Sequence, residues 1–283
     1  MRYGVLSTNV LSAICAYQTY LISMFLKIYT QVLITFLLAV LSNSAMSGES
    51  DSGQNRVPAK FYFLDNTALY FGDIDETVNH FISATADKEI NRLIINSRGG
   101  DVHFGIVFGY WIHENQIDVE VTSLCMSSCA NYIFTAARKK VIRPSALVIW
   151  HGSAEQKNLR EKNEKYEEYL ALSLSGKTSR EQEEYLASDK LRYENFSRLL
   201  SEQRQFFKNI NVNEYVTRLG QEPINYKRSW VATVEVMNKM NIQSISAPAG
   251  YGSPDYMQTY HPAQIDRLVS FGLNIQEEIK KLD

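Results

Sequence analysis

The sequence predicts an α/β fold with a mainly parallel sheet, and two observations lead to this prediction. Short apolar runs, at residues 93–95 and 146–150, are typical of strands that are buried on both faces of a sheet. Longer segments near these runs carry apolar residues at helical spacing, as at residues 73–87. Strands that alternate with helices predict right-handed crossovers and therefore parallel neighbours.

The expected elements follow one another along residues 57–155. Residues 61–64 and 69–71 are short apolar runs and are expected to be strands. The helix expected at 73–87 places four apolar residues on one face: Ile74, Val78, Phe81 and Ile82. The strand at 93–95 leads into a Gly-Gly turn at 99–100. The alternation continues with a helix, a strand, a helix and a strand, at residues 105–115, 119–122, 130–138 and 146–150.

Residues 155–204 have a different character from the rest of the chain. They are rich in Glu, Lys, Arg, Gln and Leu, with one glycine and no proline, which predicts one or two long surface helices joined near residues 173–178. A partner-binding arm and a plain exposed helical hairpin both fit this composition. Two further helices are expected at residues 212–219 and 233–240.

The size and charge of the chain narrow the classes of function. With 283 residues, 45% hydrophobic and 21% charged, the chain can bury a substantial core, and we expect one domain with appendages. The formal net charge is −2, and no run of Lys and Arg is dense enough to follow a phosphate backbone. A nucleic-acid partner is therefore not expected.

The N-terminal residues 1–45 predict a signal peptide or a membrane anchor. Between residues 5 and 41 the only formally charged side chain is Lys27, and small residues follow at 42–45. If translation starts at Met24, the segment has the pattern of a cleavable signal peptide; if Met1 is the start, an apolar stretch could anchor the chain to a membrane. Either reading predicts a polar linker at 46–56 and an exported domain at 57–283, periplasmic or otherwise translocated.

Three features could together form a catalytic site. The turn at Gly99 and Gly100 lets backbone amides approach a ligand closely and supply an oxyanion hole. Ser127 and Ser128 lie where a strand passes into a helix, although a serine at a helix start is often only a cap. His151 follows an apolar strand, at the strand end where α/β sheets place their ligands, and could act as a general base.

Residues 93–153 resemble the core of the Clp protease proteolytic subunit, and more closely its exported relatives with a Cys-x-Ser-Ser-Cys elbow. The matching pieces are residues 95–100 for the oxyanion strand, 128–136 for the nucleophile helix and 148–151 for the base. The resemblance implies a crotonase-like fold of repeated strand-strand-helix units with a charged helical insertion. It also implies serine peptidase chemistry on peptide or protein substrates, no cofactor, and a homo-oligomer.

The resemblance assigns roles to individual residues. Alignment on residues 135–136 makes Ser128 the nucleophile, and a one-residue slip makes it Ser127; Ser128 is preferred. Gly99, Gly100 and Cys129 would supply the oxyanion hole. The family's carboxylate should lie just before residue 230, but residues 225–229 contain no acid, and Asn225 could orient the imidazole instead.

Cys125 and Cys129 allow three interpretations. An exported location would permit a disulfide that braces the elbow; the alternatives are two buried thiols, or Cys129 as a thiol nucleophile beside His151. No metal site is expected, since the cysteines and the scattered histidines lack ligand spacing. His103, close after the glycine turn, is a marginal candidate for the same cleft.

The expected function is an exported or membrane-tethered serine peptidase-like hydrolase. The missing acid and the charged helices keep a second hypothesis open, namely a catalytically inactive scaffold that binds a partner. A third hypothesis, thioester chemistry on a coenzyme A substrate through the glycine turn alone, fits poorly with an exported location.

Overall fold

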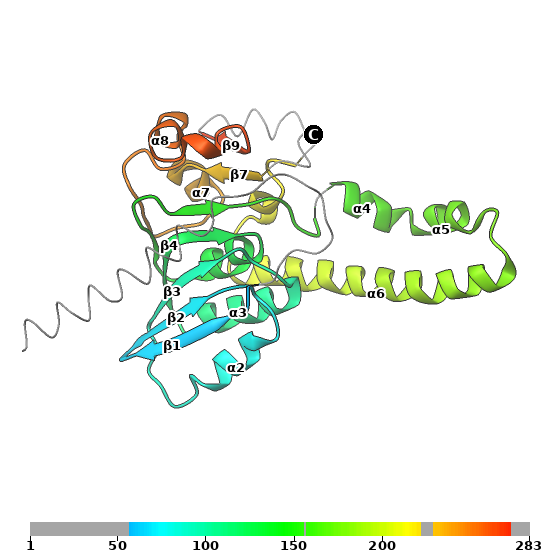
Figure 1. Ribbon diagram of the computed structural model, residues 1–283, viewed down its shortest axis with the longest axis horizontal. Coiled ribbons are helices and arrows are strands. Elements are labelled where there is room, and N and C mark those ends of the chain that lie inside the picture. The colour runs from blue at the N-terminus through cyan, green and yellow to red at the C-terminus, as the bar shows by residue number, and fades with distance from the viewer. Residues whose placement is uncertain (1–56, 156, 222–228, 273–283) are drawn as a thin grey trace, which may run out of the picture. The chain divides into compact units, whose positions relative to one another are not determined.

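The computed structural model describes residues 57–155, 157–221 and 229–272 (Figure 1). The chain divides into two units, residues 1–55 and 56–283, and all described residues belong to the second. The expected signal peptide or anchor, the linker and Asn225 lie outside the described residues. In the described part, no helix combines the length and the apolar character needed to cross a membrane.

The core of the domain is a sheet of seven strands among the described residues (Figure 1). The strands are β1 (Lys60–Leu64), β2 (Thr67–Phe71), β3 (Arg92–Ser97), β4 (Asp118–Met126), β5 (Lys140–Ile142), β6 (Leu147–Ile149) and β8 (Ile245–Ser246). Their order is β1-β2-β3-β4-β5-β8. The first part of β4 pairs with β5, and its C-terminal part pairs with β6. Every pair is parallel except β1 with β2. The predicted α/β class with a mainly parallel sheet is confirmed.

The helices connect and cover these strands. They are α2 (Thr77–Ser83), α3 (Val102–Glu114), α4 (Lys157–Glu164), α5 (Tyr166–Leu174), α6 (Ser179–Asn209), α7 (Val234–Lys239) and α8 (Pro254–Tyr260). Shorter turns are the π-helix η1 (Cys129–Phe134) and the 3-10 helices η2 (Glu214–Thr217) and η3 (Pro262–Gln264). A second, two-stranded sheet pairs β7 (Ser229–Ala232) with β9 (Leu268–Phe271).

The two sheets meet at a pair of buried tryptophans. Trp150 follows β6 and forms an isolated antiparallel bridge with Trp230 of β7, with both backbone amides bonded to the opposite carbonyl. Both side chains are fully buried. This bridge places the chain immediately after Trp150 at the edge of the main sheet.

Several elements differ from the sequence-based expectation. The helix expected at 73–87 is shortened to α2, because Ile74 pairs with Gly100 in extended conformation before the helix begins. The strand expected at 119–122 extends over all of β4. The helix expected at 212–219 is only the single 3-10 turn η2.

The charged segment forms a helical arm of α4, α5 and α6 (Figure 1). The turn before α6 closes with a capping box, in which the side chains of Thr178 and Glu181 bond to each other's backbone amides. The C-terminal part of α6 packs on α3, where Phe206 is buried against Tyr132 and would clash with any side chain at Gly109. The C-terminal end of the arm is therefore part of the core.

Candidate active site

The glycine turn after β3 lies directly against the start of η1. Gly99 has a φ of +90°, and a Cβ there would come within 2.4 Å of the Met126 carbonyl oxygen and 2.6 Å of the Ser127 Cβ. Only glycine permits this approach. The Gly99 amide donates to Ser97 Oγ at 3.0 Å, so it is not available to an oxyanion. The Gly100 amide donates to no atom of the described residues, which leaves it as the free donor of the turn.

Ser127 occupies a strained elbow between β4 and η1. Its φ is +59°, a conformation that costs a non-glycine residue energy and that clusters at active sites. The Ser127 amide donates to the Ile149 carbonyl at 3.0 Å, which holds the elbow against β6. The side chain is partly exposed, and its hydroxyl has no hydrogen-bond partner among the described residues. This serine is held in place by its backbone while its hydroxyl stays free.

Ser128 has the opposite character. It is 2% exposed, and its hydroxyl donates to the Gly100 carbonyl oxygen at 2.8 Å. The hydroxyl therefore ties the glycine turn to the start of η1. Among the described residues the Ser128 hydroxyl is therefore bonded and the Ser127 hydroxyl is not, a difference that the alignment could not show.

The helix that follows the two serines differs from the expected one. The sequence predicted a helix at residues 130–138 and gave no sign of an unusual helix type. The segment Cys129–Phe134 is instead a π-helix, in which each turn holds more residues than an α-helical turn. Helices of this kind often lie at functional sites.

A disulfide spans the elbow. Cys125 at the end of β4 is bonded to Cys129 at the start of η1, with Cα atoms 5.2 Å apart, and both residues are fully buried. Because Cys129 is bonded, it has no thiolate with which to attack a carbonyl. The disulfide links the two elements whose junction carries Ser127.

His151 faces the same pocket as Ser127. The pocket has a volume of about 290 Å³, and Gly100, Ser127 and His151 all line it. The imidazole is exposed, yet desolvation by its neighbours lowers the pKa of His151 below its usual value, opposed by a backbone hydrogen bond that raises it. The imidazole is therefore mainly neutral at pH 7, as a general base requires. Among the described residues, neither serine hydroxyl is hydrogen-bonded to the His151 ring.

Much of the remaining lining is apolar, and Ser128, Asn131 and Ser153 add polar groups to it. Val102 comes from α3, and three residues come from the arm: Leu159, Phe196 and Leu199. None of the described residues that line the pocket carries a carboxylate. The third member of a catalytic triad is therefore missing from this part of the chain, and Asn225 lies outside it.

Residues 151–155, hereafter the base loop, are tied to the core by buried polar groups. Asn131 Nδ2 donates to the Gly152 carbonyl oxygen at 3.0 Å, and Gln221 Nε2 donates to the carbonyl oxygen of His151. Ser153 Oγ lies 2.7 Å from Thr217 Oγ1 and 3.3 Å from Gln203 Nε2. These contacts fix the backbone on which the imidazole is mounted.

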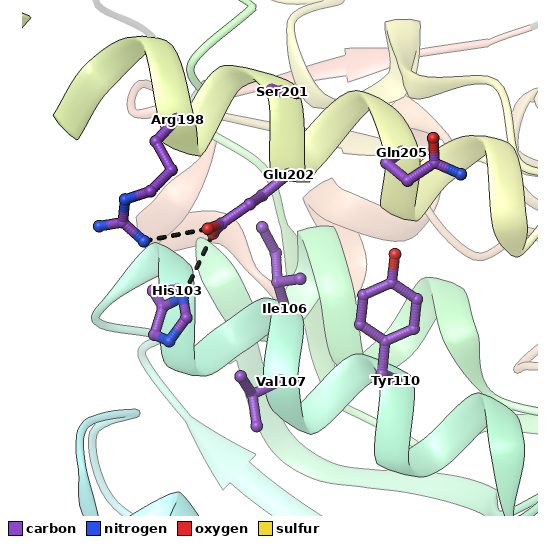
Figure 2. A pocket seen from close by; sticks show the side chains of 8 residues that line it. All are labelled: His103, Ile106, Val107, Tyr110, Arg198, Ser201, Glu202 and Gln205. Atoms are coloured by element: carbon purple, nitrogen blue, oxygen red, sulfur yellow. Dashed lines mark hydrogen bonds and ion pairs between the residues drawn. The ribbon is translucent and has the colours of Figure 1, made fainter. Parts of the chain in front are cut away.

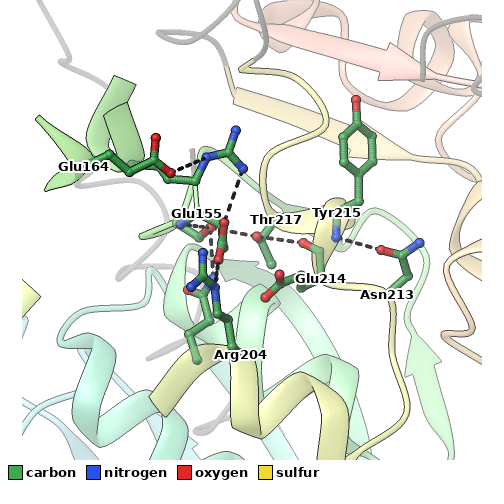
Figure 3. Close-up of polar contacts among 10 residues, drawn as sticks. Glu155, Glu164, Arg204, Asn213, Glu214, Tyr215 and Thr217 are labelled. Carbon is green, nitrogen blue, oxygen red and sulfur yellow. Dashed lines mark hydrogen bonds and ion pairs between the residues drawn. The ribbon is translucent and has the colours of Figure 1, made fainter. Parts of the chain in front are cut away.

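The end of the base loop is also tied to the arm (Figure 3). The buried Glu155 carboxylate bonds to Arg204 of α6 and lies 3.6 Å from Arg160 of α4. Figure 3 shows Glu214 close to Arg204, and burial together with the charge of Glu155 raises the pKa of the Glu214 carboxyl. The arm that forms one wall of the pocket is thus anchored four residues after the candidate base.

His103 does not belong to this pocket. It lies on α3 facing α6, with Nδ1 3.2 Å from Glu202 Oε2 (Figure 2). These side chains line a separate open groove of about 540 Å³ between the two helices. Among the described residues, no cluster of three or more side chains suited to a metal ion is found.

No family model and no curated protein matches the chain. Among solved structures, the chain is similar to a putative enoyl-CoA hydratase from Streptomyces coelicolor A3(2), at 14% identity and a TM-score of 0.25, over 38% of this chain and 52% of that one. It is also similar to a ClpP1 mutant from Listeria monocytogenes, at 20% identity and a TM-score of 0.27, over 47% of this chain and 77% of that one. A third similar structure is DspI from Pseudomonas aeruginosa, at 10% identity and a TM-score of 0.27, over 36% of this chain and 55% of that one.

The match covers only about half the length of the hydratase and of DspI. At these identities and TM-scores, no residue's role is transferred from those proteins to this chain. The site is therefore argued from its own geometry.

Sequence reasoning overlooked the groups that hold the base loop and wall the pocket. The sequence could have identified Asn131, because a residue four positions after Ser127 lies on the same face of a helix. Gln221 and Phe196 had no local signal, since their separation from His151 in sequence is closed only by the tertiary fold.

Proposed function

We propose that the chain is a serine hydrolase that works with a Ser127–His151 dyad, and that its substrates are peptides or proteins. The observation that carries this proposal is that a free hydroxyl on a strained elbow and a neutral imidazole line one pocket with the unpaired Gly100 amide. Strained backbone, a π-helix and a histidine with a perturbed pKa are features that gather at functional sites. Their coincidence at one pocket supports catalysis more strongly than each would alone.

The reaction would follow acyl transfer through a covalent intermediate. Ser127 Oγ attacks the substrate carbonyl carbon while His151 accepts the hydroxyl proton. The oxyanion is held by the amides of Gly100 and of Ser128, neither of which donates to another backbone carbonyl among the described residues. As the tetrahedral intermediate collapses, the imidazolium returns the proton to the leaving amine. Water then hydrolyses the acyl-enzyme with the same base.

The pocket favours an apolar group next to the reacting carbonyl. Leu159, Phe196 and Leu199 form a wall without charge, so an apolar side chain would be desolvated there at no cost in unpaired polar groups. A substrate with a charged group at that position would bury the charge without a partner. The proposed substrate class is therefore peptides with an apolar residue on the acyl side of the cleaved bond.

Labelling with a fluorophosphonate probe tests the nucleophile. Ser127→Ala should abolish labelling, and mass mapping of the wild-type adduct should place it on Ser127. Ser128→Ala should still be labelled, at a reduced rate, because it loses only the bond that holds the Gly100 carbonyl. An adduct on Ser128, or labelling that persists in Ser127→Ala, would reverse the assignment.

Substitution of the base provides the second test. His151→Ala should slow labelling by about a hundredfold to ten-thousandfold, as expected for loss of a general base. His80→Ala is the matched control, since His80 is exposed on α2 and does not line the pocket. Equal labelling of His151→Ala, His80→Ala and wild type would exclude the proposed dyad.

The proposal places the mature protein outside the cytoplasm. The apolar N-terminal segment supports this, and so does the Cys125–Cys129 disulfide, because such bonds persist mainly in oxidising compartments. Cell fractionation together with the intact mass of the mature chain distinguishes cleavage from anchoring. Recovery of the full-length chain in the cytoplasmic fraction would refute an exported location.

An inactive scaffold is the second candidate function. It is favoured by the absence of a carboxylate among the described pocket residues and by exposed apolar side chains on α5, namely Tyr169 and Leu172. Turnover of an unstructured protein substrate, measured with and without His151→Ala, separates the two functions. A scaffold shows no turnover in either protein, whereas a hydrolase loses turnover with the histidine.

A further inference from the structure

Two buried side-chain amides hold consecutive carbonyl groups of the base loop. Gln221 Nε2 donates to the carbonyl oxygen of His151, and Asn131 Nδ2 donates to that of Gly152 at 3.0 Å. Asn131 lies in η1 and is 3% exposed, whereas Gln221 follows η2 and is 5% exposed. The peptide that carries the imidazole is therefore held from two separate elements.

Both amides are costly for the fold. Asn131 Oδ1 and Gln221 Oε1 are buried without a hydrogen-bond partner among the described residues. A buried polar atom left unpaired costs about 1–3 kcal/mol, a cost that an apolar side chain of similar shape would avoid. Folding stability alone therefore does not account for amides at these two positions. Their donor groups are what the base loop uses.

Asn131 is bonded to both halves of the proposed dyad. Its backbone amide donates to the Ser127 carbonyl oxygen at 2.8 Å, and its side chain donates to Gly152, the residue after the base. One residue thus connects the nucleophile elbow to the base loop through two hydrogen bonds. A displacement of either element must strain or break one of them.

The base loop needs such support for two reasons. Gly152 has a φ of +128°, so its backbone can change conformation at little steric cost. In addition, none of the described residues that line the pocket offers a carboxylate to orient the imidazole. The position of the ring then depends on how firmly the backbone beneath it is held.

We propose that Asn131 and Gln221 are positioning residues that hold His151 against Ser127 in place of the carboxylate of a triad. This inference rests on the proposed function. Asn131 also lines the pocket, whereas Gln221 does not; both would act through their hydrogen bonds to the carbonyl groups of residues 151 and 152. The two amides would thereby support a serine–histidine pair whose described pocket lining offers no carboxylate.

The test compares shape-preserving variants that lack the amide donor. Asn131→Asp and Gln221→Glu keep the size of each side chain but remove the N–H groups. In fluorophosphonate labelling, each should lower the maximal inactivation rate by about ten- to a hundredfold through misplacement of the base. For Gln221→Glu the half-saturating probe concentration should stay within about twofold, because Gln221 does not line the pocket.

A double-substitution cycle distinguishes positioning from general damage. In a His151→Ala background, Asn131→Asp should change the residual labelling rate by less than about twofold, since the group through which it acts is gone. Gln243→Glu is the matched control: the exposed Gln243 donates to the Asn238 carbonyl at 2.9 Å, away from the pocket. It should label like wild type. Equal slowing by Asn131→Asp with and without His151 would overturn the inference.

Amide hydrogen exchange measures how firmly the base loop is held, independently of catalysis. The amides of residues 151–155 should exchange at least about fivefold faster in Asn131→Asp and in Gln221→Glu than in wild type. Unchanged exchange in both variants would refute the positioning role. If wild type is not labelled at all but exchange rises in the variants, the hydrolase proposal fails while the amides are still shown to hold the loop.

Discussion

Lys140 carries a buried charge whose removal should stabilise the protein. The residue lies in β5, is 4% exposed, and donates from Nζ to the Ala137 carbonyl oxygen at 2.6 Å. No carboxylate of the described residues pairs with it. Desolvation by burial accordingly lowers the pKa of Lys140 from 10.5 to about 8. Lys140→Met keeps the length of the side chain and removes the charge.

The size and sign of the effect follow from this pKa. At 1.36 kcal/mol per pKa unit, the difference between the pKa of Lys140 in the folded protein and its ordinary pKa costs the folded state about 3 kcal/mol at pH 7. Loss of the bond to Ala137 offsets about 1 kcal/mol of the gain. Lys140→Met should therefore raise the free energy of unfolding by about 2 kcal/mol at pH 7.

The gain should shrink as the solution becomes alkaline. Between pH 8 and 10.5 the folded protein has released the Lys140 proton and the unfolded chain has not, so the wild type gains stability as pH rises. Between pH 7 and 9.5 the advantage of Lys140→Met should fall by about 2 kcal/mol.

Urea unfolding at pH 7, 8.5 and 9.5 measures this difference, with the exposed neighbour Lys139→Met as the control. Groups that titrate equally in both proteins cancel in the comparison. A constant difference between wild type and Lys140→Met across this range, or a less stable variant at pH 7, would refute the reasoning.

Three further outcomes are expected. Because desolvation lowers the pKa of His151, the pH profile of fluorophosphonate labelling should reach half its maximum below pH 6.5; a midpoint above that value would contradict a desolvated base. Gly99→Ala should abolish labelling, since its Cβ would meet the Met126 carbonyl oxygen at 2.4 Å, and a normally labelled variant would show that the turn can move. Replacing both Cys125 and Cys129 by alanine should lower the free energy of unfolding by about 2 kcal/mol in urea titrations, the value for so short a closed loop, whereas unchanged stability would show no constraint from the bond.

Much of the architecture was accessible from local patterns. Apolar runs predicted the buried strands, and the Gly-Gly sequence predicted the turn whose Gly100 amide is free, because both signals arise within a few residues. The prediction that Ser127, Ser128 and His151 lie near one pocket also needed little more than the rule that parallel strands end at the same edge.

The choice between the two serines was beyond the sequence. Alignment on residues 135–136 left a one-residue ambiguity between them, and no local pattern resolves it. The free or bonded state of each hydroxyl depends on the Gly100 carbonyl, which belongs to another strand-turn unit. Similarly, α2 is shorter than its apolar pattern predicts because Ile74 pairs with that same turn.

The sequence by itself determined the α/β class, the glycine turn, the charged helical segment and the residue types available for chemistry, because these depend on composition and on periodicity over one element. The tertiary structure alone decided which serine keeps a free hydroxyl, which side chains wall the pocket, and that Gln221 and Asn131 hold the loop of His151. Gln221 and His151 are 70 positions apart, and the pocket lining runs from Gly100 to Leu199, so only packing of the whole core brings these residues together.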